Sequence, residues 1–290
     1  MKLKMIFAAL CIFFLHFGCS RQYDDELKIY FVEGPSPMKV CSIDINGNNR
    51  EIIREFPGYD VTAPGITAST DGEFIAVSLY NTASLLYDLI LMKTDGTDMR
   101  VLYSSTSSPV GFTPSFTYTG NEIAFRNVSD LKFINTNGDI TATYSGSGTF
   151  SPLRPFCLTS DRYKVIMAVT QAGNTKIFMG DLLNNATYQV NSGNDPTYIT
   201  FDPLDNDIYF LITNNLYTVK LPTSFPATVS GLPAPLASAL TSISLSADGE
   251  YIAAISTGFN LMLYDSTGTL VRTLTSGGNV YASCFESRPR

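Results

Sequence analysis

The chain has 290 residues, of which 44% are hydrophobic and 12% aromatic, enough to bury the core of one large all-β domain or of two smaller domains. Only 16% of the residues are charged, and the formal net charge of −7 argues against nucleic acid as a partner, because phosphates attract Lys and Arg. The one histidine, His16, lies near the N-terminus. The rest of the chain therefore has no imidazole for acid–base catalysis, a Ser-His-Asp triad or a zinc site.

Residues 1–18 have the pattern of a signal peptide. Lys2 and Lys4 form a charged start, and the apolar run Met5–Phe17 that follows is 13 residues long. A transmembrane helix needs about 20 apolar residues, so this run is too short to span a bilayer. We therefore expect these residues to be removed after export rather than to belong to the fold.

The end of this segment resembles a bacterial lipoprotein signal. A small residue, Gly18, precedes Cys19, which would become the lipidated first residue of the mature protein. Ser20 in the next position is compatible with the outer membrane, and residues 19–26 are mostly polar and charged, which suits a short lipidated tether. The alternative is ordinary cleavage, which would release a soluble secreted protein.

Three further cysteines would remain in the mature protein besides Cys19. They are Cys41, Cys157 and Cys284, an odd number without the spacing of a disulfide framework. One disulfide could form in an oxidising cell envelope. The other interpretation is that all three are partly buried thiols that act as small hydrophobic side chains.

A tight-turn signal recurs along the chain. Each copy follows a strand of alternating apolar residues, where Asn-Gly or Asp-Gly favours a β-hairpin because the turn needs positive φ. The copies lie at Asn46-Gly47, Asp95-Gly96, Asn137-Gly138, Asn184-Asn185, a degenerate Pro222-Thr223 and Thr267-Gly268. The mean step is (268 − 47)/5, or about 44 residues, which indicates a repeated structural unit.

A second turn signal precedes most of these hairpins. It is clearest in Ser69-Thr70-Asp71-Gly72 and Ser246-Ala247-Asp248-Gly249, where the Asp side chain can accept backbone N–H groups and the Gly supplies the turn conformation. Each unit thus offers four strands, two around each turn. Four antiparallel strands every 40–50 residues or so are typical of a β-propeller blade.

The number of blades follows from the two ends of the repeat. Five complete units run over 65–276, whereas the first unit, 27–56, has three strands and lacks the innermost one. The chain ends with a surplus strand, Val280–Phe285, which we expect to pair with Leu27–Val32 and close the ring. The prediction is an all-β fold, a six-bladed β-propeller with four-stranded antiparallel blades, as a single domain over residues 27–290.

The phrase Ser/Thr-x-Asp-Gly-x-x-Ile-Ala resembles the repeat of TolB-type, WD-repeat-like propellers. It stands at Ser69–Ala76 and Ser246–Ala253, with weaker copies at Tyr118–Ala124 and Thr159–Arg162. The resemblance implies a six-bladed, envelope-located scaffold whose channel mouth binds a protein or peptide. TolB carries an additional α/β domain before its propeller. The short segment after Cys19 leaves no room for one, so that domain is expected to be lacking.

The best candidate for a metal site is the stretch NDPTYITFDPLDND. Asp202, Asp205 and Asp207 offer hard oxygen ligands at a spacing that suits calcium. No closing glutamate follows, and Asp205 stands where other units have a tight turn, so a solvated hairpin is the other interpretation. No Gly-x-Ser-x-Gly, P-loop or dinucleotide-binding motif occurs, and no cofactor is predicted.

Binding residues are easier to place than catalytic ones. In a propeller, the connections from each outer strand to the next inner strand gather at one mouth of the central channel. Here these connections contain aromatic and charged residues, and the candidates for contact with a partner are Tyr59, Asp60, Phe112, Arg154 and Asp195. Alternatively, each of them packs against its neighbours in the loop.

The sequence therefore favours a non-catalytic lipoprotein of the bacterial cell envelope, anchored through lipid on Cys19, with the outer membrane as the expected membrane. Its propeller would bind a protein, a peptide or a glycan. Two alternatives stay open. One is a propeller enzyme, a hydrolase or lyase that uses carboxylates and a bound divalent cation, and the other is a sensor or lid module for a separate catalytic chain.

Overall fold

The computed structural model describes residues 27–35, 37–106, 113–127, 130–145, 156–159, 164–171, 174–183, 186–191, 196–202, 204, 206–221 and 233–286. Within these ranges the regular structure consists of 23 β-strands. The same ranges contain no helix of the length and hydropathy needed to cross a membrane.

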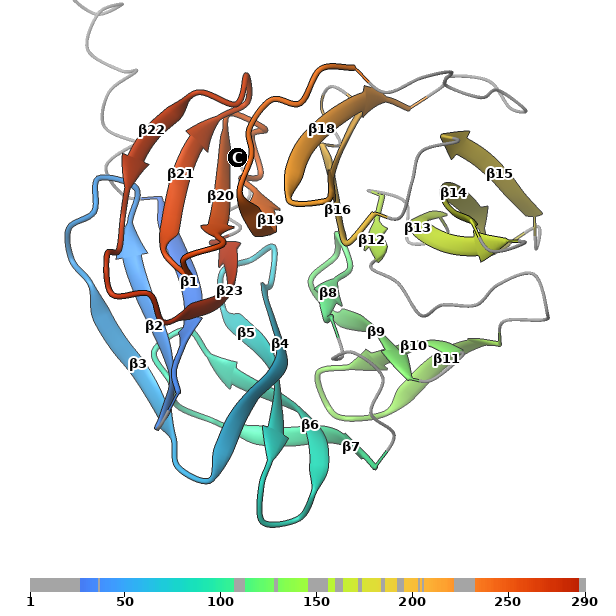
Figure 1. The fold of residues 1–290 in the computed structure, drawn as a ribbon. Helices are drawn as coiled ribbons and strands as arrows, with labels where there is room; N and C mark the ends of the chain where they lie inside the picture. Colours follow the sequence, from blue (N-terminus) through green and yellow to red (C-terminus); the bar gives the residue numbers. More distant parts are fainter. Residues whose placement is uncertain are drawn as a thin grey trace, which may run out of the picture.

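The strands form six antiparallel sheets that stand around a common centre like the blades of a propeller (Figure 1). We number the blades in chain order and give their strands from the innermost outward. Blade 1 comprises β4 (Tyr59–Ala68), β5 (Phe74–Asn81), β6 (Leu86–Lys93) and β7 (Arg100–Ser105). Blade 2 comprises β8 (Ser115–Phe116), β9 (Glu122–Asn127), β10 (Asp130–Asn135) and β11 (Ile140–Ser145). Blade 3 comprises β12 (Phe156–Leu158), β13 (Lys164–Gln171), β14 (Asn174–Asp181) and β15 (Ala186–Asn191).

The other three blades complete the ring, so the predicted six-bladed propeller is confirmed. Blade 4 has three described strands, β16 (Tyr198–Asp202), β17 (Asp207–Ile212) and β18 (Asn215–Lys220). Blade 5 comprises β19 (Leu240–Leu245), β20 (Tyr251–Ser256), β21 (Leu261–Asp265) and β22 (Leu270–Thr273). Blade 6 comprises β23 (Val280–Phe285), β1 (Lys28–Glu33), β2 (Met38–Asp44) and β3 (Glu51–Phe56).

The outer edge of blade 4 differs from the others. Residues 222–232, which follow its third strand, lie outside the described ranges. Part of the edge of β18 is covered by a later segment, because Leu216 N–H donates to Ala237 O at 2.8 Å and Leu236 N–H donates to Leu216 O at 2.7 Å. A short bridge thus stands beside β18 where the other blades have a fourth strand.

Blade 6 is built from both ends of the chain, as predicted. The C-terminal strand β23 pairs antiparallel with β1, with Ile29 opposite Phe285 and Val32 opposite Ala282. The pairing continues beyond the strand, because Glu286 N–H donates to Lys28 O at 2.8 Å. A ladder between residues about 250 positions apart therefore closes the ring.

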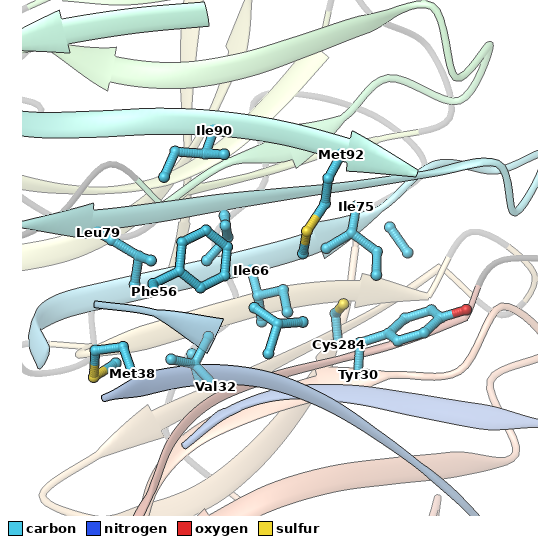
Figure 2. Close-up of a cluster of buried hydrophobic side chains, with 14 residues drawn as sticks. Tyr30, Val32, Met38, Phe56, Ile66, Ile75, Leu79, Ile90, Met92 and Cys284 are labelled. Carbon is cyan, nitrogen blue, oxygen red and sulfur yellow. The ribbon is translucent and has the colours of Figure 1, made fainter. Parts of the chain in front are cut away.

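Each interface between neighbouring blades contains its own buried apolar cluster. Figure 2 shows the one between blades 6 and 1, where Val32 and Phe56 of blade 6 meet Ile66, Leu79 and other apolar side chains of blade 1. Five similar clusters fill the other interfaces. The middle strands of each sheet are packed on both faces and lack a polar face, which explains their near-continuous apolar runs in the sequence, whereas outermost strands such as β3 and β22 are largely exposed.

Small polar residues occupy the innermost strands at equivalent positions. Where each innermost strand ends, one polar side chain is buried: Ser69, Thr117, Thr159, Asp202, Ser246 and Glu286. Two positions earlier, every blade has a hydroxyl or a thiol: Thr67, Ser115, Cys157, Thr200, Ser244 and Cys284. Innermost strands converge towards the axis of a propeller, so the space between them suits short side chains. Phe116 N–H of blade 2, for example, donates to Thr67 Oγ1 of blade 1 at 3.4 Å.

The turns that carry the repeated Asp-Gly and Asn-Gly signals lie on one side of the ring. Because strands within a blade are antiparallel, the turns between the first and second strands and between the third and fourth share one side, which we call the turn face. The connections between the second and third strands, and from one blade to the next, share the opposite side, the loop face.

The Ser-x-Asp-Gly turn is a closed hydrogen-bonded unit. Ser69 Oγ donates to Asp71 Oδ1 at 2.5 Å and accepts from Phe74 N–H at 2.9 Å, while Asp71 Oδ1 accepts from Glu73 N–H at 3.0 Å. Ser246 and Asp248 make the same contacts in blade 5. The repeated motif in the sequence is therefore explained by the geometry of one turn.

Three arginines of the outer strands join neighbouring blades at the turn face. Arg272 of blade 5 donates to Asn46 O of blade 6 at 2.9 Å. Arg54 of blade 6 donates to Gly96 O of blade 1 at 3.0 Å. Arg100 of blade 1 in turn donates to Thr136 O of blade 2 at 2.6 Å. Each arginine reaches the tight turn between the third and fourth strands of the next blade and so links the two sheets near their outer edges.

Removal of the closing strand should unfold the propeller. Deletion of residues 279–290 takes away β23 and exposes one edge of β1, so we expect loss of the cooperative melting transition and of solubility. Phe285→Ala should cost about 3–5 kcal/mol in unfolding free energy, because a buried aromatic ring is removed. The matched control deletes only residues 287–290, beyond the pairing. An unchanged melting curve for the longer deletion would contradict the closure.

Gly249 combines positive φ with a close approach to the neighbouring blade. Its φ is +73°, and a Cβ there would overlap the Asp202 carboxylate of blade 4. Gly58, with φ +80°, has no heavy atom within 4 Å of its would-be Cβ and is the matched control. Gly58→Ala should cost about 1–2 kcal/mol from backbone conformation alone, and Gly249→Ala about 1–3 kcal/mol more from overpacking. Urea unfolding measures both, and equal losses would contradict the contact with Asp202.

Candidate functional site

Two of the five candidate contact residues lie within the described part of the chain, on the loop face of blade 1. Tyr59 and Asp60 lie there, at the start of β4. The other three candidates, Phe112, Arg154 and Asp195, lie outside the described residues. Their contribution to a binding site stays a prediction.

The connection from blade 6 to blade 1 is shorter than the sequence suggests. The predicted units leave residues 57–64 between them, but here a two-residue turn, Pro57-Gly58, is followed at once by chain that is paired in the sheet. Tyr59 stands opposite Asn81 and Asp60 opposite Tyr80, followed by an irregularity before Gly65. Both candidate residues are therefore held in a sheet rather than in a free loop.

A buried carboxylate holds Tyr59 in place. Asp88 on β6 is only 4% exposed, and its Oδ2 accepts from the Tyr59 hydroxyl at 2.9 Å. The same carboxylate accepts from Ser104 Oγ at 2.6 Å and from Asn81 Nδ2 at 3.4 Å. Burial, and then the hydrogen bond to Asp88, raise the pKa of Tyr59 above its usual value. The Tyr59 ring also packs edge-on against Phe56, with centroids 5.9 Å apart.

Next to these contacts, a second set of hydrogen bonds joins β7 of blade 1 to blade 2. Ser105, next to Ser104 on β7, donates to Asn127 Oδ1 at 3.2 Å, and Asn127 Nδ2 donates to the Tyr103 hydroxyl at 2.9 Å. Lys132 of β10 donates to the same hydroxyl at 3.4 Å, with its ammonium 5.3 Å from the centre of the Tyr103 ring. We call these residues, together with Tyr59, Asn81 and Asp88, the loop-face network.

The sequence shows one sign of this network that the motif search did not use. In LYDLILMK, the strand β6, Asp88 is a single charged residue within a buried apolar run, and such a residue needs hydrogen-bonding partners. The partners themselves come from β4, β5 and β7, so only the sheet register brings them together. Chemically, the network offers hydroxyls, an amide, an ammonium and aromatic rings, which suit recognition by hydrogen bonding and ring contact.

The candidate calcium ligands are placed in different surroundings. Asp202 is buried at the end of β16, where its Oδ1 accepts from Leu204 N–H at 2.8 Å. Asp207 forms an ion pair with Lys220, with 3.3 Å between Oδ1 and Nζ. Asp205 lies outside the described residues. Among the residues that the structure covers, no group of three or more His, Cys, Asp or Glu is placed to hold a metal ion.

The three cysteines that the structure describes are free and buried, which confirms the second of the two interpretations given above. Cys41, Cys157 and Cys284 form no disulfide. Burial raises the pKa of the Cys41 thiol to about 12 and raises the pKa of Cys157 and Cys284 as well. Thiols that stay protonated and covered are poor nucleophiles, so these side chains serve packing.

Comparison with known proteins identifies the class of fold. No protein-family model and no curated protein matches the sequence. TolB from Acinetobacter baumannii aligns with a TM-score of 0.71 at 16% identity, over 92% of this chain and 68% of TolB. A chain in the crystal structure of a nidogen/laminin complex aligns with a TM-score of 0.68 at 10% identity, over 91% of this chain and 100% of the other. The fold is a β-propeller similar to that of TolB, as the sequence motif predicts.

The link between Tyr59 and Asp88 should be measurable by a double-mutant cycle. Asp88→Ala should lower the free energy of unfolding by about 1–3 kcal/mol, because the hydroxyl and amide donors around Asp88 lose their buried acceptor. Tyr59→Phe should lower it by about 1 kcal/mol. Tyr59 has a raised pKa when folded, so its contribution is complete below pH ~10 and is lost as the pH rises through the folded-state value. Urea unfolding at pH 8 and above pH 10 checks this. Additive losses at pH 8, or a Tyr59→Phe effect that is independent of pH, would contradict the pairing.

Proposed function

We propose that this protein is a non-catalytic lipoprotein of the cell envelope whose propeller binds a protein or peptide at the loop face. The observation that carries the proposal is the loop-face network, in which Asp88 fixes Tyr59 and Tyr103 fixes Lys132 at the boundary of two blades. Side chains held in one conformation lose little entropy on binding, which favours recognition.

The fold comparisons support a binding role. One of the similar chains belongs to a nidogen/laminin complex, an assembly of two proteins, and it aligns over its whole length. TolB supports an envelope location only through likeness of fold. The anchor rests on the Gly18-Cys19 sequence, which lies outside the described residues.

The chemistry of the described residues favours binding over catalysis. The Asp88 carboxylate is turned towards hydroxyl and amide donors within its own blade. The described thiols are buried and protonated at neutral pH. A propeller enzyme that uses carboxylates and a divalent cation is the competing proposal, and it predicts a stoichiometric metal ion in the purified protein.

Capture of partners from solubilised membranes tests the proposal. The bait proteins are the wild type, a Tyr59→Ala/Arg154→Ala variant and a Lys132→Ala variant, with a turn-face Glu73→Gln variant as the matched control. We expect the wild type and the control to retain the same partner. The loop-face variants should lose at least about tenfold in its recovery, equivalent to about 1.4 kcal/mol.

Two outcomes would contradict the proposal. The first is equal capture by all four baits with unchanged melting temperatures, which would place the binding surface elsewhere. The second is one equivalent of Ca²⁺ in the metal analysis of the wild type, together with loss of that ion on substitution of Asp202, which would favour the enzyme. Melting curves of each bait separate loss of binding from loss of folding.

A further inference from the structure

The polypeptide enters the propeller at the turn face. Leu27 O accepts from Ile45 N–H at 3.1 Å, and Lys28, the first residue of β1, stands opposite Asp44. These residues adjoin the tight turn at Asn46-Gly47, which joins the third and fourth strands of blade 6. Any segment that precedes Leu27 therefore reaches the propeller from this side.

The distance from the proposed anchor to this entry point is short. Seven residues, 20–26, separate Cys19 from Leu27. An extended chain advances at most about 3.3–3.6 Å per residue, so the eight steps reach no further than about 28 Å. The strands of a blade, at six residues or so, are about 20 Å long, which is the separation of the two faces.

We infer that the protein sits with its turn face towards the anchoring bilayer and its loop face away from it; this orientation rests on the proposed lipid anchor at Cys19. With the turn face down, the tether needs little of its length. With the loop face towards the bilayer, residues 20–26 would have to extend along the full height of a blade to reach Leu27, and they would be almost fully extended. An almost fully extended tether loses conformational entropy, so this arrangement is the less favourable one.

The turn face carries charges of both signs. Asp71, Asp95, Asp248 and Asp265 each accept a backbone N–H in their own turn. Their carboxylates repel anionic headgroups over a Debye length, about 8 Å at physiological salt, and Arg54, Arg100 and Arg272 on the same face offset part of this repulsion. The orientation therefore rests on the length of the tether rather than on the charge of the face.

The orientation specifies where a partner docks. The loop-face network, including Tyr59 and Lys132, is presented to the aqueous space on the side away from the anchoring membrane. A partner of this site is then a soluble protein or the exposed part of a protein held in another layer. A partner embedded in the same bilayer would instead contact the turn face or the outer strands.

Energy transfer to the membrane tests the orientation on the full-length lipidated protein. Met99→Cys places a fluorophore on the turn face of blade 1 and Ala83→Cys places one on the loop face of the same blade, and both positions are exposed. The described native thiols are buried and leave a low labelling background. In vesicles that contain acceptor-labelled lipid, energy transfer to the lipid should be about twofold more efficient from the fluorophore at Met99→Cys than from the one at Ala83→Cys. The reason is that the strands separate the two faces by about 20 Å.

The outcomes separate the orientation from the anchor. Equal transfer from the two positions, or higher transfer from Ala83→Cys, overturns the orientation while the protein still floats with the vesicles. Failure of the wild type to float, or flotation of a Cys19→Ala variant as efficient as that of the wild type, overturns the anchor and the orientation with it. The partner-capture experiment needs no anchor, so the binding role is judged independently.

Discussion

The ladder between β23 and β1 is the interaction on which the rest of the structure depends. Residues at the two ends of the fold, from Ile29–Phe285 to Val32–Ala282, complete a sheet that neither end forms alone. Without this ladder, blade 6 would have an unpaired strand edge, and its apolar clusters towards blade 1 and blade 5 would lose the side chains that β23 contributes. Because these contacts join distant residues, closure is expected late in folding, and it makes six separate sheets one cooperative unit.

The ring geometry then dictates what each strand contains. The middle strands are packed on both faces, so Ile90 of β6 faces the cluster with blade 6 while Leu89 faces the cluster with blade 2. Towards the axis the blades converge, and serine, threonine and cysteine replace larger apolar residues. At the outer edge they diverge, and arginines such as Arg54 and Arg100 span the wider gap to the next blade.

The sequence predicts local features well and contacts between blades poorly. The Ser69-x-Asp71-Gly72 turn is local, so its motif is visible in the chain, and the surplus strand 280–285 follows from counting strands. The reach of Arg54 to Gly96 depends on the angle between two sheets, which no motif encodes. The pairing of Tyr59 with Asn81 lies outside the unit predicted to begin at residue 65, because an irregularity before Gly65 interrupts the strand pattern in the sequence.

The turn face and the loop face differ in how far the fold constrains amino-acid substitution. At the turn face, the polar side chains that mark the repeat are used by the fold, since Ser246 and Asp248 close their own turn and Gly249 accommodates a neighbouring blade. At the loop face, Asn127 and Lys132 of blade 2 both donate to the Tyr103 hydroxyl of blade 1, across a blade boundary, and these contacts close no turn. Substitution there alters a surface without opening the ring. This chain and TolB share the β-propeller fold at 16% identity, and one fold can host unrelated functions, which is why the sequence indicates the fold and does not indicate the ligand.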